Sequence, residues 1–374
     1  MGASVADLLK TLVKQRGSDL HVSTGSVPMM RLHGELVKAD MPVLTAQDME
    51  IALNSIMSKS QKQDLLKNKS VDFSVPFKGV GVFRVNVFFQ RKGLTAVFRA
   101  LSEKAPSLES LSLPPICKVA CSYANGLVLV TGPTGSGKST TLAAMIDYIN
   151  TNQRRHILTL EDPVEFYHDT KRSMVNQRQL GQHFVSFASA LKAALREDPD
   201  VILVGEMRDP ETIALAITAA ETGHLVFATL HTNSASKSVD RILDSFPGEQ
   251  QGQIRSMMSE SLRVILSQKL IPTADQKNRI CVHDILVNNS AISNLIREGK
   301  TYQLPSVMQT SRKDGMQLMD QSILEAVNAG VITGEVGWEY ANDKSKLIKY
   351  APKEQVTATQ LSRVGATQAG KKSA

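Results

Sequence analysis

A glycine-rich loop between a short apolar segment and a helix start limits the folds open to this chain more than any other feature. Residues 132–139 read Gly-Pro-Thr-Gly-Ser-Gly-Lys-Ser, which satisfies GxxxxGK[ST] at every fixed position. Residues 126–131 (GLVLVT) predict a strand before the loop, and residues 140–146 (TTLAAMI) predict a helix after it. This strand–loop–helix context favours a phosphate-binding loop over a chance match.

The loop residues predict a site for a nucleoside triphosphate. Glycines let consecutive backbone N–H groups curl around a phosphate, and the helix N-terminus adds its positive end. Lys138 is expected to reach the β- and γ-phosphates, and the Ser139 hydroxyl is expected to hold Mg²⁺. With ATP and Mg²⁺ as ligands, the predicted binding residues are Gly132, Pro133, Thr134, Gly135, Ser136, Gly137, Lys138, Ser139 and Thr140.

Composition predicts a soluble, cytoplasmic protein of two domains. The 374 residues are 42% hydrophobic and 21% charged, which is an ordinary globular balance. No apolar run approaches the roughly 18–20 residues of a membrane span, and the N-terminus lacks a signal-peptide pattern. Three cysteines (Cys117, Cys121 and Cys281) cannot form a disulfide framework and suit a reducing cytosol.

The positive charge of the chain is concentrated at its C-terminal end. The formal net charge is +7. Residues 343–374 hold seven Lys and Arg against two Asp and Glu, a net +5 that leaves only +2 for the remainder. A nearly neutral body argues against a nucleic-acid partner, because a protein that tracks phosphates needs a basic channel.

Residues 1–100 predict a small α+β domain. Helical spacing of apolar residues covers residues 4–16, and a second helix is expected over residues 45–57 with Thr45 as its N-cap and Asp48 three residues later. Short apolar or alternating segments predict strands at 20–23, 29–32, 34–37, 71–75, 82–89 and 95–99.

The rest of the chain predicts a linker, an α/β domain and a tail. Residues 101–123 contain three prolines and read as a linker that leads into a short helix. Over residues 124–342, apolar strands alternate with helices, which predicts a mainly parallel sheet covered on both faces. The expected strands include 127–130, 157–160, 201–204 and 225–228, with a late helix over 316–332. Residues 343–374 predict a basic, disordered tail.

Two of these strands end in carboxylates that could act on the nucleotide. Glu206 follows strand 201–204, and Glu161 follows strand 157–160 with Asp162 and Glu165 close behind. Ligands of parallel α/β sheets lie beyond the carboxyl ends of the strands, so both acids are expected to converge on Lys138 and Ser139. There they would organise metal and water, with Glu206 joining Ser139 as a metal ligand. The alternative is that such acids only cap loops or pair with arginines.

Histidines and arginines complete the predicted site. His231, at the carboxyl end of strand 225–230, is expected to sense the γ-phosphate, whereas His224 at its start is expected to do structural work between subunits or domains. Arg84, Arg91 and Arg99 lie on the last strands of the small domain. Arg84 and Arg99 are the favoured candidates for arginine fingers that stabilise transition-state charge, and Arg196 and Arg208 are weaker ones.

Five motifs in order resemble the secretion/pilus ATPase superfamily, and most closely the PilT-like retraction ATPases of type IV pili. Ser18-Asp19-Leu20-His21 is similar to the early signature of that family, and Gly132–Ser139 is its Walker A motif. The segments that resemble the Asp box, Walker B and His box are residues 156–165, 198–209 and 222–232. The likeness extends to about residue 340.

The resemblance implies both architecture and partners. It implies a PAS-like N-terminal domain, a RecA-like ATPase domain, a ring of six subunits, and ATP held between the two domains with N-terminal arginines completing the site. It implies that either Glu161 or Glu206 acts as the general base or positions the attacking water, and it does not distinguish between the two residues. It also implies a pilus platform protein of the inner membrane as partner, a place at the inner face of that membrane, and a paralogous retraction ATPase as a possible companion.

Two positions and the C-terminal tail depart from the family pattern. Residues 291–298 read Ala-Ile-Ser-Asn-Leu-Ile-Arg-Glu, where the retraction signature has Arg in place of Ser293. The spacing of Ile292, Leu295 and Ile296 predicts a helix with one apolar stripe against the core. Pro210 stands where Leu is usual, at a helix start that tolerates Pro. The basic tail is not part of the shared pattern.

Four other functions compete with a principal retraction motor. An extension or type II secretion ATPase typically carries a Cys₄ zinc module, for which three cysteines are too few. A nucleic-acid motor conflicts with the nearly neutral body. A ring that does not hydrolyse ATP would not need Lys138, Ser139 and both glutamates intact. A PilU-like accessory motor would keep every motif, so it remains an alternative.

Overall fold

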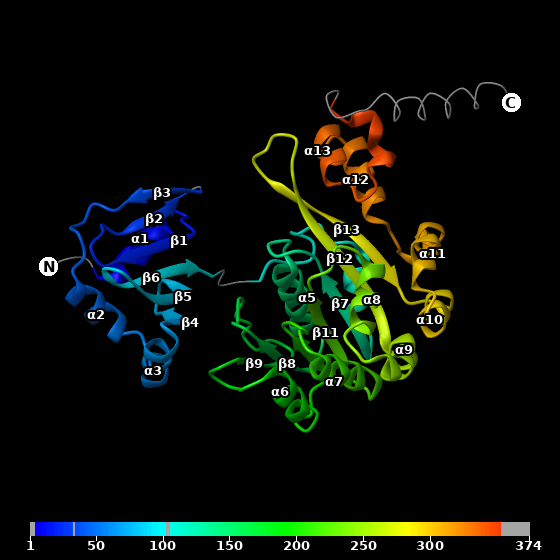
Figure 1. Ribbon diagram of the computed structural model, residues 1–374, viewed down its shortest axis with the longest axis horizontal. Coiled ribbons are helices and arrows are strands. Elements are labelled where there is room, and N and C mark those ends of the chain that lie inside the picture. The colour runs from blue at the N-terminus through cyan, green and yellow to red at the C-terminus, as the bar shows by residue number, and fades with distance from the viewer. Residues whose placement is uncertain (1–3, 33, 102–104, 353–374) are drawn as a thin grey trace. The chain divides into compact units, whose positions relative to one another are not determined.

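The computed structural model describes residues 4–32, 34–101 and 105–352. Two compact units make up the chain. The N-terminal unit comprises Met1–Ala105 with Asp162–Asp169, and the C-terminal unit comprises Pro106–Glu161 with Thr170–Ala374 (Figure 1). Among the described residues, no helix is long and apolar enough to cross a membrane.

The N-terminal unit is built on a six-stranded antiparallel sheet with the order β3-β2-β1-β6-β5-β4. Its core holds the side chains of Phe73, Phe83 and Phe98 from neighbouring strands together with Leu9 and Leu12 from the first helix. The strands are β1 (Asp19–Ser23), β2 (Met29–Leu32), β3 (Glu35–Lys38), β4 (Ser70–Phe77), β5 (Gly81–Gln90) and β6 (Gly93–Ala100). The predicted small α+β domain is confirmed.

Three helices of this unit begin at capping boxes: α1 (Val5–Lys14), α2 (Ala46–Asn54) and α3 (Lys59–Asn68). Thr45 and Asp48 cap α2 as predicted, although the helix ends before residue 57. The sequence analysis missed α3, because only Leu65 of this polar helix is buried and no apolar stripe marks it. The capping box of Ser58 and Gln61 was the available signal.

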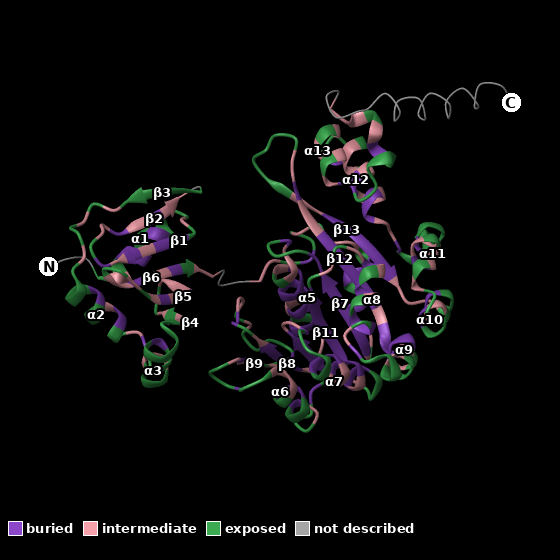
Figure 2. Ribbon diagram, viewed as in Figure 1, coloured by how far each residue is buried: buried purple, intermediate pink, exposed green. Residues whose placement is uncertain are grey.

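The C-terminal unit contains a seven-stranded sheet with the order β13-β12-β7-β11-β10-β8-β9. All pairs are parallel except β12 with β13. The central strands are buried along their whole length, as the purple ribbons of Figure 2 show. The strands are β7 (Gly126–Thr131), β8 (His156–Glu161), β9 (Met174–Gln179), β10 (Val201–Val204), β11 (Leu225–Leu230), β12 (Leu262–Pro272) and β13 (Arg279–Val287).

Helices cover both faces of this sheet, so the predicted α/β architecture with a mainly parallel sheet is confirmed. One core lies under α4 (Pro115–Ala120) and α5 (Lys138–Asn152). The core on the other face includes residues of α6 (Phe187–Ala194), α7 (Pro210–Glu221), α8 (Ala235–Leu243), α9 (Gly248–Ser261), α10 (Ser290–Arg297) and α11 (Leu304–Thr310). Two 3₁₀ turns, η1 (Thr301–Gln303) and η2 (Arg312–Asp314), flank α11.

A small helical module covers one end of β12 and β13. It consists of α12 (Met319–Asn328), α13 (Gly334–Tyr340) and η3 (Lys344–Tyr350), and its core includes Ile271, Ile323 and Leu347. The disorder predicted from residue 343 is wrong for η3, because Leu347 is fully buried and Asp343 caps the turn. The rest of the predicted tail, residues 353–374, lies outside the described residues.

Candidate active site

The phosphate loop follows the buried strand β7 and leads into α5. Gly132, Gly135 and Gly137 all have positive φ, between 79° and 146°. At Gly132 a Cβ atom would lie 2.4 Å from the Gln268 carbonyl oxygen, so only glycine fits there. The loop therefore needs its glycines for conformation as well as for backbone access.

Lys138 begins α5 and its ammonium group is held inside the loop. Its Nζ donates to the carbonyl oxygens of Gly132 at 2.9 Å and Pro133 at 3.0 Å. The Ser136 hydroxyl is buried and has no hydrogen-bond partner among the described residues. A cationic group, an unpaired hydroxyl and the open space beside Gly135 fit a bound phosphate group. Ser139 is exposed in the first turn of α5, where its hydroxyl is accessible to a metal ion.

A buried glutamine supports this loop, and the sequence analysis missed it. Gln268 lies in β12 and is 1% exposed. Its Nε2 donates to the Ser136 carbonyl at 2.7 Å, and its Oε1 accepts from the Thr141 hydroxyl at 3.1 Å. The only sequence signal was a polar stretch, Ser267-Gln268-Lys269, directly after the apolar run Val264-Ile265-Leu266.

Glu206 and His231 lie together beyond neighbouring strand ends. Strand β11 lies between β7 and β10, and its pairing with β7 ends at Leu230 opposite Thr131. His231 Nε2 is 3.2 Å from Glu206 Oε1, while Arg208 donates to the other carboxylate oxygen of Glu206 at 2.7 Å. The Arg208 bond and charge, with a smaller effect of His231, hold the pKa of Glu206 below its ordinary value. Glu206 is therefore an ionised carboxylate at neutral pH.

Glu161 ends β8, one strand beyond β10. The Thr159 hydroxyl on the same strand donates to its Oε1 at 2.6 Å, and Gln177 on the adjacent β9 donates to the same atom at 3.1 Å, so these two side chains orient the carboxylate. Strands lie about 4.8 Å apart, which puts β10 about 10 Å and β8 about 14 Å from β7. Glu206 therefore follows the strand nearer to the phosphate loop, and Glu161 follows the more distant one.

His224 lies at the opposite end of β11 from His231. Its Nδ1 is 3.0 Å from the Ala219 carbonyl in the last turn of α7, and its own carbonyl accepts from Gly126 at the start of β7. These contacts join a helix end to two strands of one unit. The predicted structural role of His224 between subunits or domains is not tested by these contacts within one unit and stays a prediction.

A family model described as "Type II/IV secretion system protein" matches residues 3–343. This chain belongs to that family. The match spans both units, including the strand-end acids and the phosphate loop.

Three relatives narrow the resemblance within the Type II/IV secretion family. A "Twitching motility protein" of Neisseria gonorrhoeae is 50% identical over 344 residues, which cover 92% of each chain. The type IV pilus ATPase PilU of Pseudomonas aeruginosa is 38% identical and covers 91% of this chain and 89% of its own. A crystal structure of the pilus retraction motor PilT with bound ADP superposes with a TM-score of 0.87 at 45% identity, covering 93% and 99% of the two chains. The chain is thus a nucleotide-binding ATPase of this family with a RecA-like ATPase domain.

The N-terminal unit places the two favoured arginines opposite one another. Arg84 in β5 pairs in register with Arg99 in β6, which in turn pairs with Asp19 in β1. Arg99 Nε donates to Asp19 Oδ1 at 2.8 Å, and Arg84 Nε is 3.6 Å from Asp72. Like charges directly opposite on a sheet are destabilising, and here each arginine has a carboxylate partner of its own that offsets the repulsion. Arg91 and Arg196 are exposed.

Helix α10 carries the departure from the retraction signature. Ile292 and Ile296 are fully buried, which confirms the predicted apolar stripe. The Ser293 hydroxyl donates to the Ser259 carbonyl of α9 at 2.8 Å. In this chain, the residue that replaces Arg therefore ties α10 to α9.

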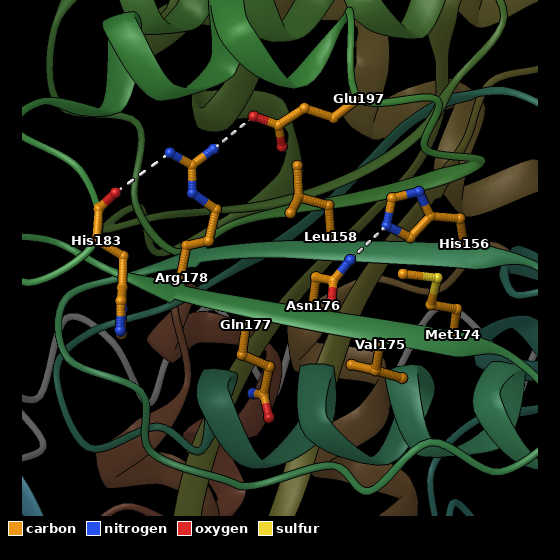
Figure 3. Close-up of a pocket in the computed structure, with 9 residues that line it drawn as sticks. All are labelled: His156, Leu158, Met174, Val175, Asn176, Gln177, Arg178, His183 and Glu197. Carbon is orange, nitrogen blue, oxygen red and sulfur yellow. Dashed lines mark hydrogen bonds and ion pairs between the residues drawn. The ribbon is translucent and has the colours of Figure 1, made fainter.

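A pocket at the outer edge of the same sheet is separate from the phosphate loop. It lies along β8 and β9, where Asn176 bonds His156 and where Arg178 bonds Glu197 and the His183 carbonyl (Figure 3). The order of strands puts β9 four positions from β7. Several of its polar side chains already pair with one another.

Proposed function

We propose that this chain is the motor that hydrolyses ATP to retract type IV pili, the process that powers twitching motility. One observation carries the proposal. This chain is similar to PilT along almost its whole length, and it keeps a complete phosphate loop. The ionised carboxylate of Glu206 lies beside His231, beyond the ends of adjacent strands. Hydrolysis would drive movement of the subunits and removal of pilin from the base of the pilus.

The roles proposed for the loop and strand-end residues follow from their chemistry. Lys138 exchanges its two carbonyl contacts for the phosphates, and loop N–H groups hold the phosphate oxygens. Ser139 and Glu206 are the residues suited to hold Mg²⁺, which when bound would neutralise phosphate charge. His231, next to Glu206, reports the state of the γ-phosphate.

The lowered pKa of Glu206 makes it a weak base and a good metal ligand. Water positioning then falls to Glu161, whose orientation by Thr159 and Gln177 suits that task. Arg84 and Arg99 would supply positive charge to the transition state, for which each would leave its present carboxylate partner.

The assembly proposed for this ATPase is a homohexamer in the cytoplasm at the inner face of the cytoplasmic membrane. Its partner there would be the inner-membrane platform protein of the pilus, and nucleic acid has no part in the proposal. We also propose the domain limits 1–100, 101–123 and 124–342, with α4 and η3 packed against the last of these domains and a basic tail following η3. A PilU-like accessory motor is the alternative, and the lower identity to PilU than to PilT favours the principal motor.

Surface piliation and twitching of cells that carry Lys138→Ala at the native locus test the proposal. We expect excess pili and lost motility, because extension would continue while retraction stops. The matched control is Lys192→Ala, which removes an exposed lysine of α6 and should leave both readouts unchanged. Unchanged piliation and motility in the Lys138 variant would point to an accessory motor or another machine, and DNA-stimulated hydrolysis by the purified protein would then identify a nucleic-acid motor.

A further inference from the structure

Gln268 occupies a position on β12 that brings its side chain under the phosphate loop. Strand β12 pairs in parallel with β7, and Ser267 is the partner of Thr131, the last residue of β7. Gln268 follows Ser267 within β12, and Gly132 follows Thr131 as the first residue of the loop. The backbones of these two residues are in close contact, because a Cβ atom added to Gly132 would lie only 2.4 Å from the carbonyl oxygen of Gln268.

The Gln268 carboxamide joins two parts of the nucleotide-binding segment. Its N–H donates to the carbonyl of Ser136 within the loop, and its oxygen accepts from the hydroxyl of Thr141 in the first turn of α5. Ser136 and Thr141 are each 3% exposed, so water does not compete with these bonds. Only a side chain with both a donor and an acceptor can satisfy the two groups together.

The bond to Ser136 fixes the direction of the following N–H group. The carbonyl of Ser136 and the N–H of Gly137 belong to one planar peptide group and point in opposite directions. Because Gln268 holds the carbonyl toward β12, the N–H of Gly137 points away from β12. Gly137 has a φ of 90°, and a Cβ atom there would lie 3.2 Å from the Gln268 amide nitrogen, so the peptide is closely confined.

We propose that Gln268 is a positioning residue of the phosphate loop, which presets the Ser136–Gly137 peptide so that its N–H is ready to bind a phosphate oxygen. Gln268 does not touch the nucleotide and acts through this peptide alone. The proposal rests on nucleotide binding at the loop and is independent of which machine the ATPase drives.

Nucleotide affinity and turnover of the full-length Gln268→Met variant test this role. Met fills a similar volume but makes neither bond, so we expect the Kd of a fluorescent ADP analogue to rise about tenfold, with a parallel rise in the KM for ATP. The matched control is Gln153→Met, which removes a single bond to the Cys121 carbonyl at the far end of α5. This control should keep wild-type affinity. Wild-type affinity in a folded Gln268→Met protein would overturn the proposal.

The Gln268→Glu variant gives a second test that does not depend on the stability of the Met variant. An ionised Glu cannot donate to the Ser136 carbonyl, whereas a protonated Glu can. We therefore expect weak ADP binding at pH 8 and recovery of at least several-fold at pH 5.5, beyond any pH effect on the wild type. A residue that only filled space would not produce this pH profile, so equal affinity relative to wild type at both pH values would contradict the role of Gln268.

Discussion

Each of the two sheets of this protein contains a buried aspartate, and burial in the two sheets is accompanied by pKa shifts of opposite direction. Asp19 in β1 of the N-terminal unit and Asp284 in β13 of the C-terminal unit are 4% and 3% exposed. Burial opposes ionisation of Asp19, but bonds from Ser18 and Arg99 outweigh it and lower its pKa. At Asp284, burial dominates over backbone bonds such as that from Ala235 and raises the pKa to about 6.

The difference follows from how each sheet meets solvent. The antiparallel sheet has residues such as Arg84 and Arg99 that are partly or largely exposed in mid-strand, so charge can lie on its face. The parallel sheet is covered on both faces, and its central strands contain hardly any ionisable residues. Ionisable residues of this unit therefore gather where strands end, as at Lys138, Glu206 and His231.

Among the residues at the strand ends of the parallel sheet, Lys138 is the one whose replacement should reduce ATP hydrolysis most. Replacement by Ala removes the cation that the loop holds for the phosphates, and we expect phosphate release from ATP to fall below detection while the melting temperature stays near that of the wild type. Lys192→Ala is the matched control for loss of a lysine. Substantial turnover in the Lys138 variant would place the reactive centre elsewhere.

Substitution of Glu206 and of Glu161 separates the roles of the two glutamates that follow strands of the parallel sheet. Glu206→Gln should bind ATP but hydrolyse it about 10²–10⁴-fold more slowly, because it loses the carboxylate proposed to hold Mg²⁺. Glu161→Gln should also slow hydrolysis, without the loss of Mg²⁺ affinity expected for Glu206→Gln. Single-turnover rates and a magnesium titration separate the two roles. Normal hydrolysis by Glu206→Gln would remove that residue from the mechanism.

Two Asp→Asn variants test the opposite pKa directions. The folded pKa of Asp284 is raised above the unfolded value, so its contribution to stability is fully present below about pH 3.8 and is lost as pH rises through 6. Asp284→Asn should therefore gain about 2–3 kcal/mol over the wild type at pH 8 and little near pH 4.

Asp19→Asn should behave in the opposite way. The folded pKa of Asp19 is lowered, so its stabilising effect is present above about pH 3.8 and is lost as pH falls through the folded value. Denaturant unfolding of both variants at pH 8, and of Asp284→Asn also at pH 4, provides the measurement. The same sign of change in both variants at pH 8 would contradict the comparison.

The smallest effect is expected on the exposed face of the N-terminal sheet. Arg99→Ala leaves the buried Asp19 with Arg31 at 3.8 Å, and we expect a loss of about 1 kcal/mol in unfolding free energy because Arg99 itself is largely solvated. Arg84→Ala should lose less, about 0.5 kcal/mol, since its partner Asp72 is half exposed. A larger loss for Arg84→Ala would show that the Asp19 pair is not the stronger one.

The amino-acid sequence alone determined the parts that depend on neighbouring residues. The phosphate loop, the capping box of α2 and the buried strands of the parallel sheet were predictable, because positive φ, caps and apolar runs are properties of a few consecutive positions. The helix α3 and the short helix η3 were not predicted, because neither has an apolar pattern. Each has a capping residue at its start and a single buried leucine.

Only the tertiary structure decided which distant residues meet. The insertion of β11 between β7 and β10 brings His231 to Glu206, and the pairing of β12 with β7 brings Gln268 beneath the loop. Asp19 and Arg99 meet across 80 residues of chain for the same reason. Strand order and register arise from packing summed over the whole sheet, so no local segment of the sequence contains them.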